Sequence, residues 1–202
     1  MGLAARVPER SQAAFEELRE RLAAHALPAR HEAIASAIPA LDRLLGGGFP
    51  KGGLTTLEGP VGSGRWALAA RLLAIWTRRG LAAVLDGGAL YPPALACAGV
   101  ALQRLLVVPA TAPIDGARAA DVLVRSRLCG VVALDALSLR AAAWSRLAGL
   151  AHKNGTLLLV VATQPPPELT SAARLRVCFE RAARNELALR IRHERIRIRC
   201  SQ

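Results

Sequence analysis

Residues 59–66 read Gly-Pro-Val-Gly-Ser-Gly-Arg-Trp, and their glycines have the spacing of a phosphate-binding loop. In such a loop the glycines let backbone N–H groups converge on phosphate oxygens, a lysine reaches the terminal phosphates, and a small hydroxyl side chain binds Mg²⁺. Here Arg65 and Trp66 stand at the lysine and hydroxyl positions. The pattern predicts a nucleotide-binding frame whose chemical groups have changed.

Arg65 and Trp66 differ in how strongly they indicate a loss of nucleotide chemistry. The chain holds 25 Arg and only two Lys, so a general preference for arginine is enough to explain Arg65. That preference does not explain Trp66, because a bulky aromatic replaces a small hydroxyl at this position. Indole also offers Mg²⁺ no oxygen ligand. A guanidinium still contacts phosphate, but its planar fork does not reproduce the point charge of an ammonium. We expect phosphate contacts to remain available and efficient hydrolysis to be lost. The degenerate nucleotide-binding residues of the loop are Gly59, Gly62, Ser63, Gly64, Arg65 and Trp66.

A second signature is the apolar run 129–135, which ends in Asp135. In proteins with a phosphate-binding loop, an acid at the end of a buried strand holds Mg²⁺ directly or through water. A lone strand-end aspartate also often caps the next element, and that structural alternative stays open. The apolar run 156–163 leads in the same way to Gln164. Asp135 and Gln164 complete the predicted degenerate site, where both can persist as structural relics.

Residues 187–200 alternate apolar residues with arginines. The alternation shifts by one residue near positions 193–194, which predicts a turn there. On each of the two short strands that result, the arginines lie on one face and the apolar residues on the other. The last 29 residues hold nine Arg and three Glu, half of the formal net charge of +12. This ribbon predicts an acidic partner, either nucleic acid or an acidic protein surface. Its candidate contact residues are Arg190, Arg192, Arg195, Arg197 and Arg199.

Near the N-terminus, Phe15, Leu18 and Leu22 recur at helical spacing among charged residues. They predict an amphipathic helix over 11–25, which Pro28 ends. Its narrow apolar stripe docks either on the chain's own core or on a partner, and we favour a partner or a neighbouring subunit. We therefore divide the chain into a helix with its connector (1–33) and a core (34–202) that includes the basic ribbon (187–202).

Apolar runs alternate with helical patterns through the core, which predicts an α/β fold with a mainly parallel central sheet flanked by helices. A short helix over 38–45 should precede the glycine loop. The remaining expected strands are 54–58, 81–86, 105–109, 129–135, 156–163 and 175–179, and the remaining expected helices are 66–77, 94–99, 115–126 and 139–153.

The cysteines and histidines are dispersed, so their spacing predicts neither a metal site nor a redox pair. No stretch approaches the roughly 20 apolar residues that span a membrane. Residues 1–10 lack the apolar core of a signal peptide. We expect a soluble cytoplasmic protein with reduced thiols.

The order of these signals resembles the RecA-like ATPase core over roughly residues 34–200. The resemblance is carried by 38–53, the 59–66 loop, Asp86, the strand ending in Asp135, and 156–164. Within that superfamily, the short length, helical N-terminus, eroded loop and arginine-rich C-terminus look most like ImuA. ImuA is the RecA-like accessory protein of bacterial DNA-damage-induced mutagenesis.

The resemblance implies a non-enzymatic adapter in translesion synthesis. Such an adapter links RecA to an ImuB-type, polymerase-like partner and an error-prone replicative-type polymerase. The family pattern has a catalytic glutamate shortly after the second strand, where this chain has Gly88. Both DNA-binding loops of RecA also look shortened or lost. We therefore expect no ATP hydrolysis and no required cofactor, while weak ATP binding stays open.

Two other functions remain as alternatives. A DNA-binding module would use the arginine ribbon to follow phosphates, and its scarcity of nearby aromatics argues against base stacking. The structural explanation of the same arginine pattern is a pair of basic strands whose arginines are simply solvated. The second alternative is a SulA-like inhibitor of cell division, because that group also resembles a reduced RecA-like core. The recognisable glycine-loop motif of this chain argues against that function.

Overall fold

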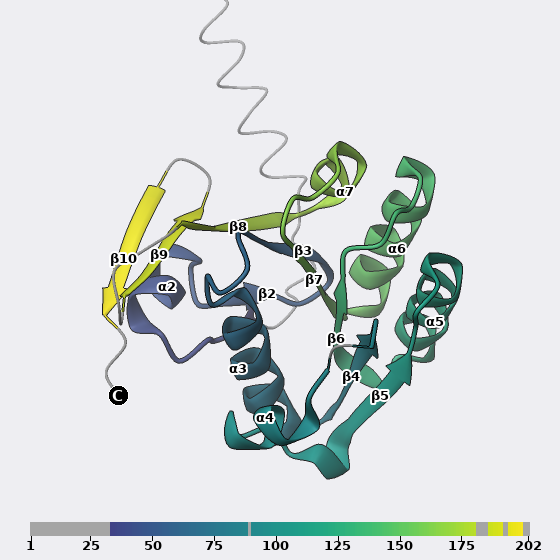
Figure 1. The fold of residues 1–202 in the computed structure, drawn as a ribbon, viewed down its shortest axis with the longest axis horizontal. Helices are drawn as coiled ribbons and strands as arrows, with labels where there is room; N and C mark the ends of the chain where they lie inside the picture. The colour runs from purple at the N-terminus through teal and green to yellow at the C-terminus, as the bar shows by residue number, and fades with distance from the viewer. Residues whose placement is uncertain (1–32, 89, 181–185, 192–193, 200–202) are drawn as a thin grey trace, which may run out of the picture. The chain divides into compact units, whose positions relative to one another are not determined.

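The computed structural model describes residues 33–88, 90–180, 186–191 and 194–199 (Figure 1). For 186–188 and 194–199 it describes the backbone only. The predicted N-terminal helix, with Phe15, Leu18 and Leu22, lies outside the described residues. No helix in the described part is both long and apolar enough to cross a membrane.

The predicted α/β fold with a mainly parallel central sheet is confirmed. The large sheet has the strand order β10-β9-β8-β3-β7-β6-β4-β5. The six strands from β8 to β5 run parallel, and β9 and β10 are added antiparallel at one edge. The strands of this sheet are β3 (Gly53–Glu58), β4 (Leu81–Asp86), β5 (Leu105–Pro109), β6 (Cys129–Asp135), β7 (Leu157–Ala162), β8 (Leu175–Glu180), β9 (Glu186–Ile191) and β10 (Glu194–Arg199).

Helices cover both faces of the sheet (Figure 1). On one face, α3 packs on the central strands and α4 lies beside it. On the other face, α5 and α6 pack on the sheet and α7 packs on α6. The helices are α2 (Pro39–Leu44), α3 (Arg65–Thr77), α4 (Pro92–Cys97), α5 (Pro113–Ser126), α6 (Ala141–Asn154) and α7 (Pro167–Ala172), with a 3₁₀ turn at Leu102–Arg104.

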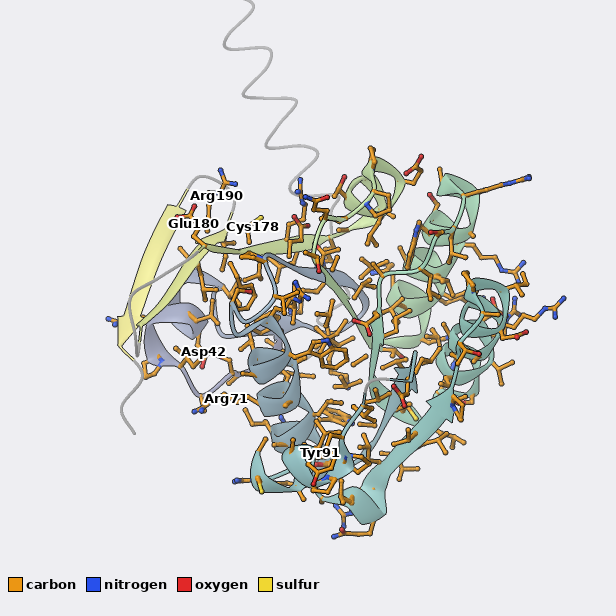
Figure 2. All side chains as sticks on the ribbon, viewed as in Figure 1. Asp42, Arg71, Tyr91, Cys178, Glu180 and Arg190 are labelled. Atoms are coloured by element: carbon orange, nitrogen blue, oxygen red, sulfur yellow. The ribbon has the colours of Figure 1, made fainter. Side chains whose placement is uncertain are left out.

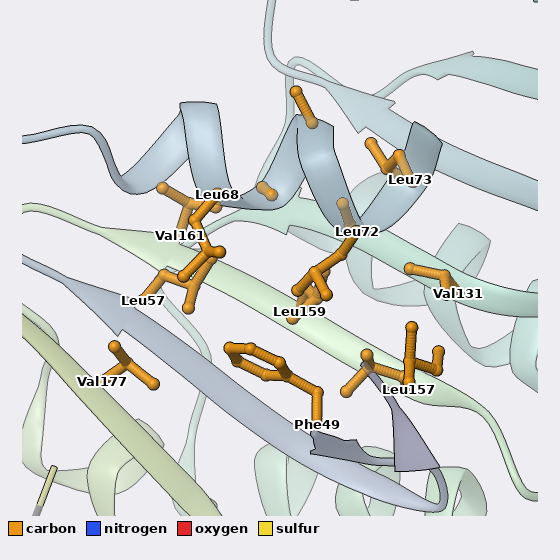
Figure 3. Close-up of a cluster of buried hydrophobic side chains, with 14 of the residues drawn as sticks. Phe49, Leu57, Leu68, Leu72, Leu73, Val131, Leu157, Leu159, Val161 and Val177 are labelled. Atoms are coloured by element: carbon orange, nitrogen blue, oxygen red, sulfur yellow. The ribbon is translucent and has the colours of Figure 1, made fainter. Parts of the chain in front are cut away.

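The sheet forms where the sequence has uninterrupted apolar runs. Every residue of β3 and of β7 is buried, as expected for parallel strands with helices on both faces. Leu57 and Leu159 contribute to the core under α3, together with Leu72 from that helix (Figure 3). Trp144 of α6 is fully buried in the second core, on the opposite face.

Hydrogen bonds fix the segment that leads into the core. The guanidinium of Arg71 in α3 donates to the backbone oxygens of Ser36 (2.7 Å) and Ala37 (3.0 Å). Asp42 of α2 accepts from both the backbone N–H and the hydroxyl of Ser36, each at 2.7 Å. Arg71 and Asp42 lie on the same side of the molecule (Figure 2). These contacts order the stretch just before α2, for which the sequence predicted no helix or strand.

Short elements account for most differences from the predicted secondary structure. The described residues begin with β1 (Ala33–Ile34), which pairs antiparallel with β2 (Phe49–Pro50). The proline run after Gln164 leads into the helix α7, which was not among the predicted helices. Its first residue is Pro167, and proline is tolerated there because the first helical N–H has no intrahelical partner.

Candidate functional site

The glycine loop joins β3 to α3 at the carboxyl end of the sheet. Gly64 is the N-cap of α3 and has a left-handed backbone (φ 91°). Gly59 has φ 152°, and a Cβ there would lie 2.8 Å from the Cβ of Phe179 in β8. Glycine is therefore required at position 59 by the close approach of a neighbouring strand as well as by the turn.

Arg65 turns back onto its own loop. Its Nη1 donates a hydrogen bond to the backbone oxygen of Gly59. A guanidinium that binds the loop carbonyl has part of its hydrogen-bonding capacity occupied within the loop. Arg65, at the position of the usual lysine, thus links the end of the loop to its first residue.

Trp66 reaches the strand-end acid. Its Nε1–H donates to Oδ1 of Asp135 over 3.3 Å, which joins the first turn of α3 to the end of β6. The sequence predicted both residues in one degenerate site, and the structure brings them into contact. The indole offers no oxygen, and the Asp135 oxygen that it contacts already accepts a hydrogen bond. These residues do not fit the Mg²⁺ of an intact loop.

The environment of Asp135 disfavours its charge. Desolvation raises the pKa of its carboxyl, and the nearby Asp86 carboxylate raises it further. The hydrogen bond from Trp66 and the positive charge of Arg65 oppose that rise without cancelling it. The residue as a whole remains exposed at the end of its strand. Asp135 therefore has less stabilisation than a metal-bound or ion-paired carboxylate would have.

Asp86, at the end of β4, organises the loop that follows it. Its Oδ1 accepts from the backbone N–H groups of Gly88 (2.8 Å) and Leu90 (2.9 Å). Gly88 itself is exposed and has φ 102°, a conformation that favours glycine. The position predicted to have lost a catalytic glutamate is thus a tight turn.

Gln164 lies apart from the contact between Trp66 and Asp135. It is exposed after β7 and lines a shallow basin on the side of Gly59 that faces β8. Arg176 and Arg190 line the same basin. The structure therefore divides the predicted degenerate site into two places.

The basin contains a buried carboxylate that the sequence analysis did not single out. Glu58, the last residue of β3, accepts two hydrogen bonds from Arg176, each of 2.8 Å. Thr56 donates to the same carboxylate at 2.5 Å, and the Cys178 thiol lies 3.4 Å from it. Desolvation acts to raise the pKa of Glu58, but the hydrogen bonds from Arg176 and Thr56 outweigh it, so that pKa is lowered. The signal available in the sequence was an acid at the end of a predicted buried strand.

Arg190 is the only arginine of the predicted ribbon whose side chain the structure describes. It is exposed on β9, between buried Leu189 and Ile191, and its Nε lies 3.8 Å from Oε1 of Glu180. Figure 2 shows Arg190 and Glu180 near Cys178.

The backbone register indicates how the other arginines of the ribbon are arranged. The antiparallel pairing of β9 and β10 puts Arg195 opposite Arg190, Arg197 opposite Ala188 and Arg199 opposite Glu186. Arg192 lies outside the described residues. A basic face on this strand pair stays a prediction.

No group of three or more His, Cys, Asp or Glu in the described part of the chain is arranged to hold a metal ion. The cysteines that the structure describes, Cys97, Cys129 and Cys178, are free thiols. Burial raises the pKa of the Cys129 thiol, and desolvation together with the Glu58 carboxylate raises that of Cys178. Both thiols are therefore poorly ionised and weakly nucleophilic.

Comparison with known proteins relates this chain to a protein family and to RecA proteins. The model of the MT3502 N-terminal domain family matches residues 43–167, well over half of the chain. RecA from Nostoc punctiforme is 36% identical over 111 residues, which cover 54% of this chain and 31% of that protein. RecA from Parasynechococcus marenigrum is 35% identical over 111 residues, which cover 54% and 30%. The chain thus spans less than a third of these RecA proteins, and the part that matches is RecA-like.

Proposed function

This chain belongs to the MT3502 N-terminal domain family, and from that premise we propose that it is a non-catalytic, RecA-like adapter in DNA-damage-induced translesion synthesis. In this proposal it acts as an ImuA-type protein. It links RecA with an ImuB-type, polymerase-like partner in a complex with an error-prone replicative-type polymerase.

The observation that carries the proposal is the contact between Trp66 and Asp135. The side chain at the Mg²⁺-binding hydroxyl position donates a 3.3 Å hydrogen bond to the acid that would hold the same metal. Arg65 meanwhile donates to Gly59 within the loop. Loss of a positioned base costs about 10²–10⁴ in rate, and loss of charge stabilisation adds to this. A RecA-like core with these losses is better suited to binding proteins than to ATP turnover.

Similarity to RecA supports RecA as one partner. A chain that shares the core of RecA presents related surfaces, and such surfaces can enter the same assembly. Direct DNA binding is the second candidate function. It is favoured by the strand register that pairs Arg190 with Arg195. If the ribbon follows phosphates, each arginine removed should reduce the slope of log K against log salt concentration by about one.

Co-purification with RecA from the same organism tests the proposal. The protein should retain RecA after washing in at least one of the conditions tested, which are with and without nucleotide and single-stranded DNA. Deleting 187–202 is a poor test of the ribbon, because Leu189 and Ile191 are buried and their removal would uncover the core. Arg195→Gln with Arg197→Gln is the better variant, because it leaves the buried residues of β9 in place.

Two results would contradict the proposal. One is the absence of RecA binding in every condition. The other is DNA-stimulated ATP hydrolysis by the purified chain that disappears in Arg65→Ala, because the glycine loop would then be a working catalytic site. Retention of RecA by wild type with loss in the double arginine variant would assign the contact to the β9–β10 pair.

A further inference from the structure

A largely apolar cavity of about 460 Å³ opens beside Trp66 and Asp135. Its walls come from the first turns of α3, the end of β4, and α4 with the loop before it. This volume lies within the range of about 300–1,000 Å³ that is usual for binding pockets. The cavity is separate from the basin that contains Gln164 and Arg176.

Small side chains on two helices leave this space open. Ala67 and Ala70 line it from α3, while Ala94 and the C-cap residue Ala98 line it from α4. Spacings of three and four residues put each pair on one helix face. Within α4 only Leu95 is buried. The two helices thus line the cavity mainly with alanines, while Leu95 of α4 packs into the core cluster that includes the leucines of α3.

The lining of the cavity includes two acidic and two aromatic side chains. Apart from the Tyr91 phenol, the ionisable side chains among its described lining residues are the carboxyls of Asp86 and Asp135. Tyr91, just before α4, is 67% exposed (Figure 2). The chain as a whole carries a net charge of +12, so two carboxylates at one opening contrast with the rest of the molecule. They disfavour a phosphate and favour a cation.

We propose that this cavity is a docking site for a partner protein that inserts one large apolar side chain and places a lysine or arginine beside Asp86 and Asp135. The inference rests on the adapter function proposed above and identifies the surface that holds a partner. A buried aromatic side chain removes about 150–250 Å² from water, and such anchors dominate the affinity of many interfaces. The neighbouring cation supplies selectivity, because both carboxylates line the cavity.

Short peptides probe the site directly. The ¹⁵N-labelled full chain is titrated with acetyl-Gly-Phe-Arg-Gly-amide, and its Phe-Glu and Ala-Arg counterparts serve as controls. Three tryptophans give three indole N–H signals, and a Trp66→Phe sample assigns the one of interest. We expect a saturable shift of the Trp66 signal with Phe-Arg, and affinities at least about tenfold weaker for both controls.

Two exposed alanines of α4 provide a matched pair of variants. Ala94 lines the cavity, whereas Ala96 is exposed on the same helix and does not line it. Ala94→Phe should fill the mouth and weaken Phe-Arg binding by at least about tenfold, whereas Ala96→Phe should leave it unchanged. Because both residues are exposed, both variants should keep the wild-type melting temperature. Asp135→Asn should reduce the preference for Phe-Arg over Phe-Glu.

Equal affinity for all three peptides, or unchanged binding in Ala94→Phe, would overturn the inference. RecA binding by a protein that binds none of the peptides would overturn the docking site and leave the adapter function intact. Peptide binding with the expected selectivity but without RecA binding would support the docking site and remove RecA as the partner. The two proposals therefore fail separately.

Discussion

At the scale of single residues, the main finding is that the altered groups of the glycine loop contact other parts of the site. The sequence was sufficient to predict that Trp66 cannot bind Mg²⁺, because that follows from the chemistry of indole. It was not sufficient to predict the partner of Trp66, since Asp135 is 69 residues away. The contact depends on where α3 begins relative to the end of β6, and residue spacing alone does not give that distance.

The pKa of Asp135 leads to a stability prediction. Desolvation raises this pKa in the folded chain, so folding disfavours the charged form. Asp135→Asn should therefore raise the melting temperature near neutral pH, because the amide oxygen still accepts from Trp66 without carrying charge. The gain should shrink as the pH falls through the raised pKa, where wild type also becomes neutral. Thermal unfolding at about pH 7 and about pH 3 measures both effects. A lower melting temperature for Asp135→Asn at neutral pH would show that the charge stabilises the fold.

Glu58 has the opposite pH dependence. Hydrogen bonds from Arg176 and Thr56 outweigh desolvation and lower its pKa, so its contribution to stability is complete above the ordinary pKa of glutamate and is lost as pH falls through the lowered one. Arg176→Met should cost about 2–4 kcal/mol at neutral pH, because it leaves a buried carboxylate unpaired. The Arg176 side chain is 48% exposed, so the cost should stay below that of a fully buried pair.

A double-mutant cycle gives the control for this pair. In a Glu58→Gln background, Arg176→Met should cost less than about 1 kcal/mol, because no charge is left unpaired. Equilibrium denaturation of the four proteins measures the coupling free energy. Equal costs of Arg176→Met in both backgrounds would mean that the ion pair contributes no stability. This pair joins residues 118 positions apart, so it required the register of β3 with β8 and was missed in the sequence.

At the scale of elements, the long buried strands and the longer helices could be predicted from apolar runs and helical periodicity. The apolar sequences of β6 and β7 left little ambiguity, because parallel strands covered on both faces are apolar throughout. The two-residue strands β1 and β2 could not be predicted, since periodicity needs several residues to show. The helix α7 was not predicted, because prolines usually interrupt a helix. Here they lie at its start, where proline is tolerated.

The contact between α3 and β6 requires a glycine. A Cβ on Gly130 would lie 2.0 Å from Cζ2 of Trp76. The indole is held in place, because its Nε1 donates to the Leu81 oxygen at 2.9 Å and the Lys51 ammonium lies 4.4 Å from the ring centroid. Gly130→Ala should therefore destabilise the protein by about 1–3 kcal/mol.

Gly149→Ala is the matched control for that substitution. Gly149 lies within α6, and a Cβ there meets no atom within 4 Å, so alanine should stabilise the protein by about 0.5–1 kcal/mol. Chemical denaturation of both variants gives the comparison. If Gly130→Ala is as stable as wild type, the Trp76 ring can move aside at no cost and the packing argument is wrong.

At the scale of the whole molecule, the chain combines a RecA-like core with a glycine loop in which Arg65 binds the loop itself and Trp66 binds Asp135 at the end of β6. The core could be predicted because strand, glycine loop and helix follow one another in a fixed order. The partner surfaces could not, because they depend on which side chains of separate elements are exposed together. The alanine-lined cavity beside α3 and α4 is the partner surface that we propose, and alanine in a helix gives no sign of which face it occupies.

Sedimentation velocity of an equimolar mixture of this protein and RecA from the same organism tests the adapter function most directly. It should be run without nucleotide and again with ATP, Mg²⁺ and single-stranded DNA. The adapter function predicts that this protein sediments with RecA in at least one condition, with no ATP turnover by this chain alone. Independent sedimentation in every condition, or ATP turnover by the isolated chain, would contradict it.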